Sequence, residues 1–218
     1  IYFAASSPRY NWDVIGYVGC IKGLEIEDKE TLHRAVYSGL RNKVSAEKFS
    51  FLLGGVESGK YYRQVMGNDA EAFYQTLPYY QIRVIYLALV YLASGLGIEI
   101  FLATYLVSAI TVILGLWVIY FTFRPYINNY LLYTIPIFGL AFGINKVAAL
   151  SGPDGLAFLM VAIIGYLFTR ANWLIFIIAS LSILVRTDLI IFGLMILSYF
   201  WVCKKSWRYL TVASIFAC

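Results

Sequence analysis

From residue 82 onward the chain alternates between apolar stretches and short polar turns, and this pattern limits the possible folds more than any other feature. A helix needs about 20 predominantly apolar residues to cross a bilayer, and several of these stretches approach that length. The whole chain is 61% hydrophobic and 13% charged, whereas soluble domains are about 25% charged. We therefore predict an all-α protein, a polytopic transmembrane helical bundle. Its spans are expected at residues 82–95, 98–123, 129–145, 156–169 and 174–203.

The region of residues 6–81 is polar by contrast and holds most of the acidic residues. Asp28 is placed to cap a helix with an apolar stripe, made up of Leu32, Ala35, Val36 and Leu40. Asn68 and Glu71 resemble a capping box for a second helix, which Pro78 would stop. We expect two to four short amphipathic helices that lie along the membrane interface, in one long extracytoplasmic loop.

The remaining segments complete the expected organisation. The apolar residues 1–5 and the lack of an initial Met predict the end of a preceding transmembrane helix. Residues 82–218 would then be the transmembrane part of a fragment of a longer chain. The three cysteines, Cys20, Cys203 and Cys218, fit neither a disulfide framework nor a metal site, so we expect free thiols. No metal-ligand set is predicted, since the sequence contains no CxxC and no HExxH motif.

Small and charged residues mark where the apolar helices should end or meet. Pro136 is expected to interrupt the third span, and Gly139 and Gly143 have the four-residue spacing that lets helices approach closely. Glu99 lies at the start of the second span, where an acid is stabilised by the helix dipole.

The basic residues predict an orientation in the membrane. Lys204, Lys205 and Arg208 follow the last long span, and such clusters usually face the cytoplasm. Counting five spans back puts residues 6–81 on the non-cytoplasmic side and the turn at Asp154 on the cytoplasmic side. The count assumes that residues 174–203 form one long helix. Two half-helices that meet at Arg186 are the alternative, and they would reverse the predicted sides. The net charge of +5 is spread thinly, which favours anionic lipid head groups as partners over nucleic acid.

Asp13 is the first candidate for a functional residue. It lies in the aromatic segment Asn11-Trp12-Asp13, with Tyr17 four residues later, shortly before the lipid-embedded region. We interpret it as the water-facing mouth of a membrane-embedded site. The alternative is an ordinary carboxylate that opens a helix, with Asn11 or Asp13 as the cap.

Arg186 and Asp188 are the second candidates, because they lie near the middle of an apolar segment. A charged side chain at the bilayer centre costs about 2.5–3.5 kcal/mol on insertion scales, so it normally faces a polar cavity or a partner. Positions i and i+2 of a helix point apart, so we expect the two side chains not to pair with each other. An arginine here could bind a lipid-linked phosphate, or it could lock helices together in an ion pair.

Two further residues are candidates because of where they lie. Asp154 is flanked by Gly152, Pro153 and Gly155, so it could line a polar cavity or simply cap the next helix. Arg83 lies at the start of the first long apolar stretch, where its side chain can reach lipid head groups.

Together these features resemble the GT-C class of integral-membrane glycosyltransferases. The resemblance rests on the acidic segment Asn11-Trp12-Asp13 with Tyr17, on Arg83, on Ser151-Gly152-Pro153-Asp154, and on Leu184-Val185-Arg186-Thr187-Asp188. The motifs are short, and the architecture as a whole carries most of the likeness. The second acid that some members have next to the first one is missing beside Asp13.

The resemblance implies an enzyme of the bacterial inner membrane that takes a sugar from a polyprenyl-phosphate donor. Asp13 would be the general base for the acceptor hydroxyl, or a carboxylate that assists a divalent metal. Arg83 or Arg186 would stabilise the leaving phosphate, with Tyr17, Asp154 and Asp188 lining the substrate site. The alternative is a non-catalytic subunit held in a larger membrane complex by its aromatic faces and its polar loop.

Overall fold

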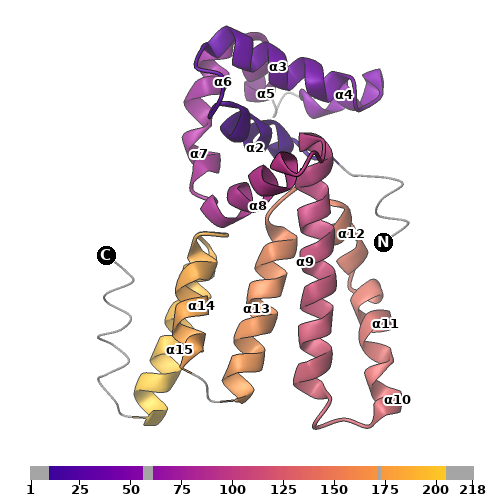
Figure 1. Cartoon of the computed structure of the whole chain (residues 1–218), viewed down its shortest axis with the longest axis vertical. Coiled ribbons are helices and arrows are strands. Elements are labelled where there is room, and N and C mark those ends of the chain that lie inside the picture. The colour runs from indigo at the N-terminus through magenta and orange to yellow at the C-terminus, as the bar shows by residue number, and fades with distance from the viewer. Residues whose placement is uncertain (1–9, 56–60, 171–172, 205–218) are drawn as a thin grey trace. The chain divides into compact units, whose positions relative to one another are not determined.

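The computed structural model describes residues 10–55, 61–170 and 173–204, and the secondary structure of these residues is helical, as predicted (Figure 1). The expected end of a preceding helix at residues 1–5 lies outside them. The chain divides into two compact units, each described by itself. We call residues 10–107 and 150–152 the N-terminal unit, and residues 108–149 and 153–204 the C-terminal unit.

The N-terminal unit is built from short helices. They are α2 (Asp13–Lys22), α3 (Lys29–Arg41), α4 (Ala46–Leu52), α5 (Tyr61–Asn68), α6 (Ala70–Thr76), α7 (Pro78–Gln81) and α8 (Val84–Gly95), followed by the first turns of α9 (Ile100–Phe123). Between residues 13 and 81 there are thus more helices in the described part than the two to four that we expected.

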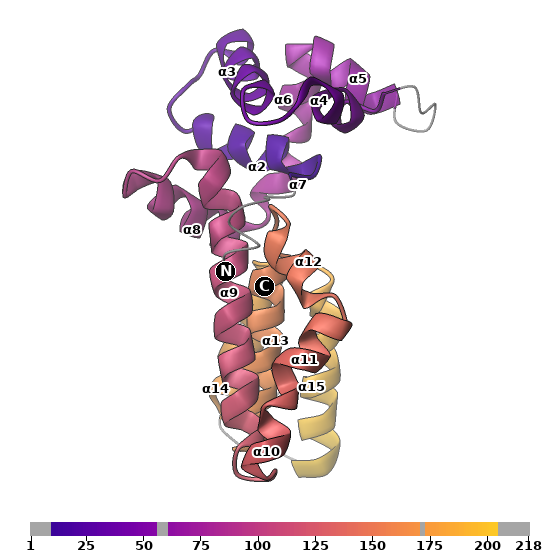
Figure 2. The same cartoon turned by 90° about the vertical axis from the view of Figure 1, so that its right-hand side faces the viewer.

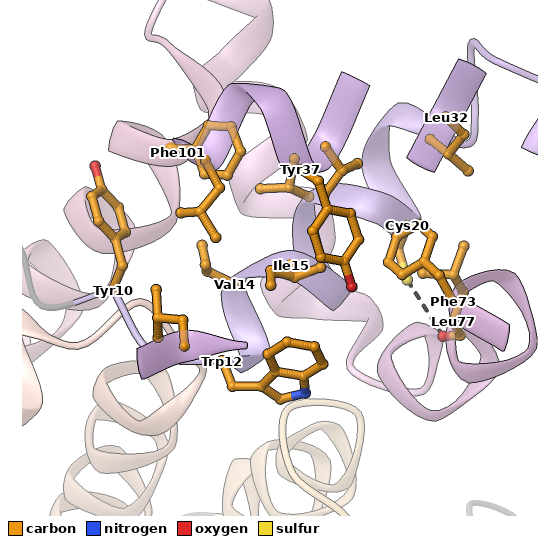
Figure 3. Close-up of a cluster of buried hydrophobic side chains, with 14 residues drawn as sticks. Tyr10, Trp12, Val14, Ile15, Cys20, Leu32, Tyr37, Phe73, Leu77 and Phe101 are labelled. Carbon is orange, nitrogen blue, oxygen red and sulfur yellow. Dashed lines mark hydrogen bonds between the residues drawn. The ribbon is translucent and has the colours of Figure 1, made fainter. Parts of the chain in front are cut away.

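These helices enclose a hydrophobic core of their own (Figure 3). The stripe of α3 was correctly predicted, because Leu32, Val36 and Leu40 are fully buried. Almost all of α2 is buried as well, including Val14 and Ile15. The apolar faces therefore pack against each other within the unit, and burying them does not require a membrane surface.

The helix ends follow local rules, with one correction. Asp28 caps α3 as predicted, since its carboxylate accepts a hydrogen bond from the backbone N–H of Thr31 at 2.8 Å. The cap of α6 is Asp69, not Asn68, because the Asp69 carboxylate accepts from the backbone N–H groups of residues 71 and 72. Pro78 does not stop a helix but begins α7, at the first-turn position where its missing N–H is harmless.

The C-terminal unit consists of apolar segments that run in alternating directions (Figures 1 and 2). After α9 come α10 (Asn129–Leu132), α11 (Thr134–Ala141), α12 (Ile144–Ala149), α13 (Asp154–Thr169), α14 (Leu174–Ile183) and α15 (Leu189–Lys204). Residues 108, 154 and 186 consequently share one end of this unit. The other end holds the C-terminus of α9, α10 and the last turns of α13 and α15.

Glycines determine how closely the segments of this unit approach. A Cβ atom at Gly155 would clash with the backbone carbonyl of Ser108, so α13 begins in direct contact with α9. Gly139 is less restrictive, since its Cβ would lie 3.2 Å from Ile144 and in ordinary contact with Leu116 of α9, at 3.6 Å. Gly143 differs from our expectation: it has a φ of 78° and ends α11. This turn, not Pro136, separates α11 from α12, because Pro136 lies in the first turn of α11.

The expectation of one long helix at residues 174–203 is wrong. The segment forms two helices, α14 and α15, that pack against each other and meet at residues 184–188, as in the alternative that the sequence left open. The polar side chains of Arg186, Thr187 and Asp188 lie at this break. An apolar stretch of that length can therefore be a helical hairpin.

Only α9 among the described helices is long and apolar enough to cross a membrane by length and composition. The other apolar helices of the C-terminal unit are shorter, and α14 with its 10 residues is about 15 Å long. Many large apolar side chains of this unit are nevertheless exposed, among them Trp117, Ile137, Phe138, Phe142, Leu194 and Met195.

Candidate functional site

The candidate residues fall into two groups, one in each unit. Asp13, Tyr17 and Arg83 lie in the N-terminal unit, whereas Asp154, Arg186 and Asp188 lie in the C-terminal unit. A chamber shared by both groups therefore stays a prediction, and the geometry of each group is described separately.

Asp13 is half-buried at the start of α2 and does not cap it. The N-cap residue is Trp12, which makes no side-chain cap bond, and Asp13 occupies the first turn, where the helix dipole favours its negative charge. Its Oδ1 accepts a hydrogen bond from the hydroxyl of Tyr80 at 3.3 Å, and its Oδ2 accepts from Nδ2 of Asn11 at 3.3 Å. The carboxylate is thus oriented by two neutral donors.

Arg83 and Tyr17 lie in the same group. The Arg83 guanidinium carbon is 5.4 Å from the centre of the Tyr17 ring and 5.6 Å from that of Tyr80. Tyr17 is 1% exposed and packs edge-on against the rings of Tyr80 and Tyr86. A ring this deeply buried supports Arg83 through a cation–π contact and has little surface to offer a ligand.

The two charges of this group do not neutralise each other. Within the described part of the chain, neither the Asp13 carboxylate nor the Arg83 guanidinium forms an ion pair. Tyr80 links them instead, because its hydroxyl bonds to Asp13 while its ring faces Arg83. Burial raises the pKa of Tyr80, and the nearby charge of Asp13 raises it further, so this hydroxyl keeps its proton and donates it.

Three buried polar atoms of the N-terminal unit have no hydrogen-bond partner in the described structure. They are Oδ1 of Asn11 and the hydroxyls of Tyr37 and Ser151. The Asn11 side chain is the same one that donates to Asp13. A buried acceptor without a donor costs about 1–3 kcal/mol, so the Asn11 oxygen is an unsatisfied polar atom close to the Asp13 carboxylate.

The second group is an ion-pair cluster at the end of the C-terminal unit where α13 begins. The guanidinium of Arg186 donates to Asp188 through Nε at 3.0 Å and through a terminal nitrogen at 2.9 Å. The other terminal nitrogen donates to Asp154. Our expectation that Arg186 and Asp188 do not pair is therefore wrong, because residues 184–188 are not helical and the i, i+2 rule does not apply to them.

This cluster ties the turn between α14 and α15 to the start of α13. Asp154 was expected to cap α13 or to line a cavity; it does not cap that helix, and its carboxylate binds Arg186 instead. Because the Nε and both terminal nitrogens of Arg186 already donate to Asp188 and Asp154, a lipid phosphate would have to displace a carboxylate to bind this guanidinium. Arg83 is the candidate arginine that has no such competitor in the described structure.

Sequence reasoning missed two residues that shape the Asp13 group. Asn11 stands in the acidic segment, but its bond to Asp13 could not be foreseen from spacing alone. Tyr80 is 67 residues away from Asp13 in the sequence, so no local pattern connects the two. Asp13 does not line the hollow that is described below. Among the described residues, no cluster of His, Cys, Asp or Glu could hold a metal.

Comparison with known proteins adds no relative. No family model matches the chain, and neither the curated proteins nor the solved structures contain a significant match.

Proposed function

We propose that the protein is a membrane glycosyltransferase that moves a sugar from a polyprenyl-phosphate donor to an acceptor hydroxyl on the non-cytoplasmic side. The observation that carries this proposal is the Asp13–Tyr80–Arg83 arrangement, in which a carboxylate and a guanidinium share one tyrosine without pairing with each other. Sugar transfer with inversion needs both kinds of group, a base for the acceptor and positive charge at the leaving phosphate.

In this mechanism Asp13 takes the proton of the acceptor hydroxyl as the new glycosidic bond forms. Asn11 and Tyr80 hold the carboxylate in place through the hydrogen bonds that they donate to it. Arg83 binds the departing polyprenyl phosphate, for which its planar fork of donors is well suited. A divalent metal beside Asp13 is the alternative role for this carboxylate.

The exposed apolar surface of the C-terminal unit supports a place in the bilayer. Soluble monomers rarely expose large contiguous apolar patches. Here α9, α11 and α15 all expose large apolar side chains, such as Trp117, Phe138 and Met195. In the proposed arrangement α9 crosses the bilayer, and the exposed apolar faces of the shorter helices beside it contact lipid. The protein would then be a multi-pass protein of the bacterial inner membrane.

The distribution of charge supports the orientation. The end of the C-terminal unit that holds the C-terminus of α9 carries Arg124, Arg170 and Lys204, with no acid among its described residues. At the opposite end the charges cancel, because Lys146 and Arg186 are balanced by Asp154 and Asp188. By the positive-inside rule the first end faces the cytoplasm. In this orientation Asp154 lies on the non-cytoplasmic side, as in the count that takes residues 174–203 as two helices.

The test is transfer of a labelled sugar from a polyprenyl-phosphate donor by the full chain in liposomes. We expect Asp13→Asn to lower the rate by about 10²–10⁴-fold, because it removes the base and keeps the shape. Arg83→Lys should raise KM for the donor, since a lysine keeps the charge but loses the fork.

The matched control is Glu27→Gln, which neutralises an exposed carboxylate of the same unit and should leave the rate unchanged. Thermal unfolding of each variant shows that the fold is retained. Full activity of a folded Asp13→Asn variant would end the assignment of the base.

A non-catalytic subunit of a larger membrane complex is the second candidate. It is favoured by the ion-pair cluster of Arg186, in which the deeper positive charge is already neutralised by protein. This candidate predicts no transfer by the wild-type chain and recovery of the chain with other membrane proteins after mild solubilisation.

A further inference from the structure

The C-terminal unit contains an apolar hollow that none of the candidate residues lines. It lies between α9 and the α10–α11 segment and has a volume of about 600 Å³. This is within the range of small-molecule sites, about 300–1,000 Å³. The lining is apolar along most of its length, with Ile113, Leu116 and Trp117 on α9 and Pro136 on α11. Such a shape suits a hydrocarbon chain.

One end of the hollow is polar. Arg124, directly after the last residue of α9, lines it together with Tyr120 and Tyr133. In the described part of the chain the Arg124 guanidinium has no ion-pair partner. The acids of this unit, Asp154 and Asp188, lie at the opposite end and are held by Arg186. An anionic ligand would complement the charge of Arg124.

The surroundings of Arg124 have the composition of a membrane interface. Tyr126, Tyr130 and Tyr133 are all largely exposed, and they follow α9 or lie in and next to α10 at the same end of the unit (Figure 2). Tyrosines gather where the hydrocarbon core meets the head groups, because each ring has one apolar and one polar end. The hollow thus runs from a head-group level into an apolar interior.

We propose that this hollow binds one anionic glycerophospholipid, with an acyl chain along α9 and the phosphate on Arg124. The site rests on the membrane placement in the proposed function but not on catalysis. An arginine fork can bind two phosphate oxygens at once, and the hydroxyls of Tyr120 and Tyr133 can donate to others. A zwitterionic lipid carries its own cation beside the phosphate and therefore gains less from Arg124.

Trp117 provides the readout, because its indole lines the hollow. The full chain in detergent micelles is titrated with brominated phosphatidylglycerol and, separately, with brominated phosphatidylcholine, whose bromine atoms quench tryptophan fluorescence on contact. We expect saturable quenching with an affinity about tenfold higher for phosphatidylglycerol. Trp117→Phe should remove the saturable part of the signal, since Trp117 lines the hollow, whereas Trp12 and Trp173, the other tryptophans whose side chains are described, do not.

Arg124→Gln should reduce the affinity for phosphatidylglycerol to that for phosphatidylcholine. The matched control is Arg170→Gln, which removes another arginine at the same end; its guanidinium lies 5.6 Å from the ring centre of Tyr166, away from the hollow. Equal affinities of the wild type for both lipids, or an equal loss in both variants, would overturn the proposal. Competition by millimolar inorganic phosphate would overturn it too, because it would indicate a site for a free anion.

The outcome is independent of the sugar-transfer assignment. Asp13→Asn should keep the lipid preference, and Arg124→Gln should keep the transfer activity in liposomes. A wild-type chain that transfers sugar but shows no lipid preference would therefore reject the lipid site alone. Loss of transfer in Asp13→Asn together with an intact lipid preference would support both proposals separately.

Discussion

Helix α3 of the N-terminal unit and helices α11 and α15 of the C-terminal unit use apolar side chains in opposite ways. In the N-terminal unit, helices with one apolar face turn it inward, so Leu32, Val36 and Leu40 are fully buried while the charged residues of α3 point outward. In the C-terminal unit the helices are apolar all round, and side chains such as Phe142 and Met195 remain exposed. Similar lengths of helix are therefore suited to different surroundings.

Polar side chains differ in the same manner. The N-terminal unit distributes its charges along its helices, and pairs such as Lys29–Glu71 lie on an exposed surface. The C-terminal unit has its charged residues near the ends of segments or in turns, where Arg186 gathers two carboxylates. The position of charged residues along a helix therefore distinguishes a helix that packs in water from one suited to lipid better than overall hydropathy does.

The largest expected effect tests the core of the N-terminal unit. Leu32→Ala removes a fully buried side chain and should lower the free energy of unfolding by about 2–5 kcal/mol, through lost burial and a new cavity. Leu24→Ala is the control, because Leu24 is 71% exposed in the same unit, and it should change stability by at most about 0.5 kcal/mol. Thermal unfolding in detergent measures both. Equal effects would mean that this unit has no core of the kind described.

The next prediction tests whether the exposed apolar face of α15 meets lipid. Met195→Asp places a carboxylate near the middle of that helix and should cost about 2.5–3.5 kcal/mol of insertion free energy. Leu24→Asp, the same change at an exposed site of the N-terminal unit, should leave insertion unchanged. Membrane integration of the full chain in microsomes is the measurement. If both variants integrate like the wild type, α15 does not contact lipid and the contrast between the units is lost.

Much of the fold could be predicted from apolar periodicity. The helices expected at residues 98–123 and 156–169 are observed at Ile100–Phe123 and Asp154–Thr169, and Glu99 caps the first with bonds to two backbone N–H groups. The break at residues 184–188 was predicted only as the alternative, because this segment contains no Gly or Pro. Arg186 and Asp188 themselves were the signal, since two charges in an apolar run can mark its end as well as a site within it.

The candidate site was predictable only in part. The aromatic acidic segment pointed to Asp13, and the start of the next helix pointed to Arg83. Their common partner Tyr80 could not be predicted, because helix α7 brings it to α2 through a tertiary contact that no local pattern encodes. The ion-pair cluster was missed for the same reason, as Asp154 and Arg186 come from different helix ends.

A smaller effect is expected at alkaline pH, where the stability of the N-terminal unit should fall. Burial raises the pKa of the Cys20 thiol to about 12, and burial together with Glu99 raises the pKa of Tyr10 to about 12. Because the folded state holds these protons more tightly, the stabilisation is complete below about pH 9 and is lost as the pH rises from about 9 to 12. Unfolding of the N-terminal unit should become easier over this window. Cys20→Ala should make the loss less steep, and an unchanged slope would contradict the role of the thiol.

The smallest effect is expected for the ion pair of Arg186 and Asp154. Their side chains are 39% and 35% exposed, so in water the pair should contribute about 0–1 kcal/mol. A double-mutant cycle with Arg186→Gln and Asp154→Asn, followed by thermal unfolding, measures the coupling. The exposed pair Lys29–Glu71 serves as the reference, and its coupling energy should be too small for the cycle to resolve. The cycle should be repeated in liposomes, because lipid around this end of the C-terminal unit would lower the local dielectric and strengthen the coupling. The same small value in detergent and in liposomes would mean that water reaches the cluster in both, as expected if it lies at the membrane surface.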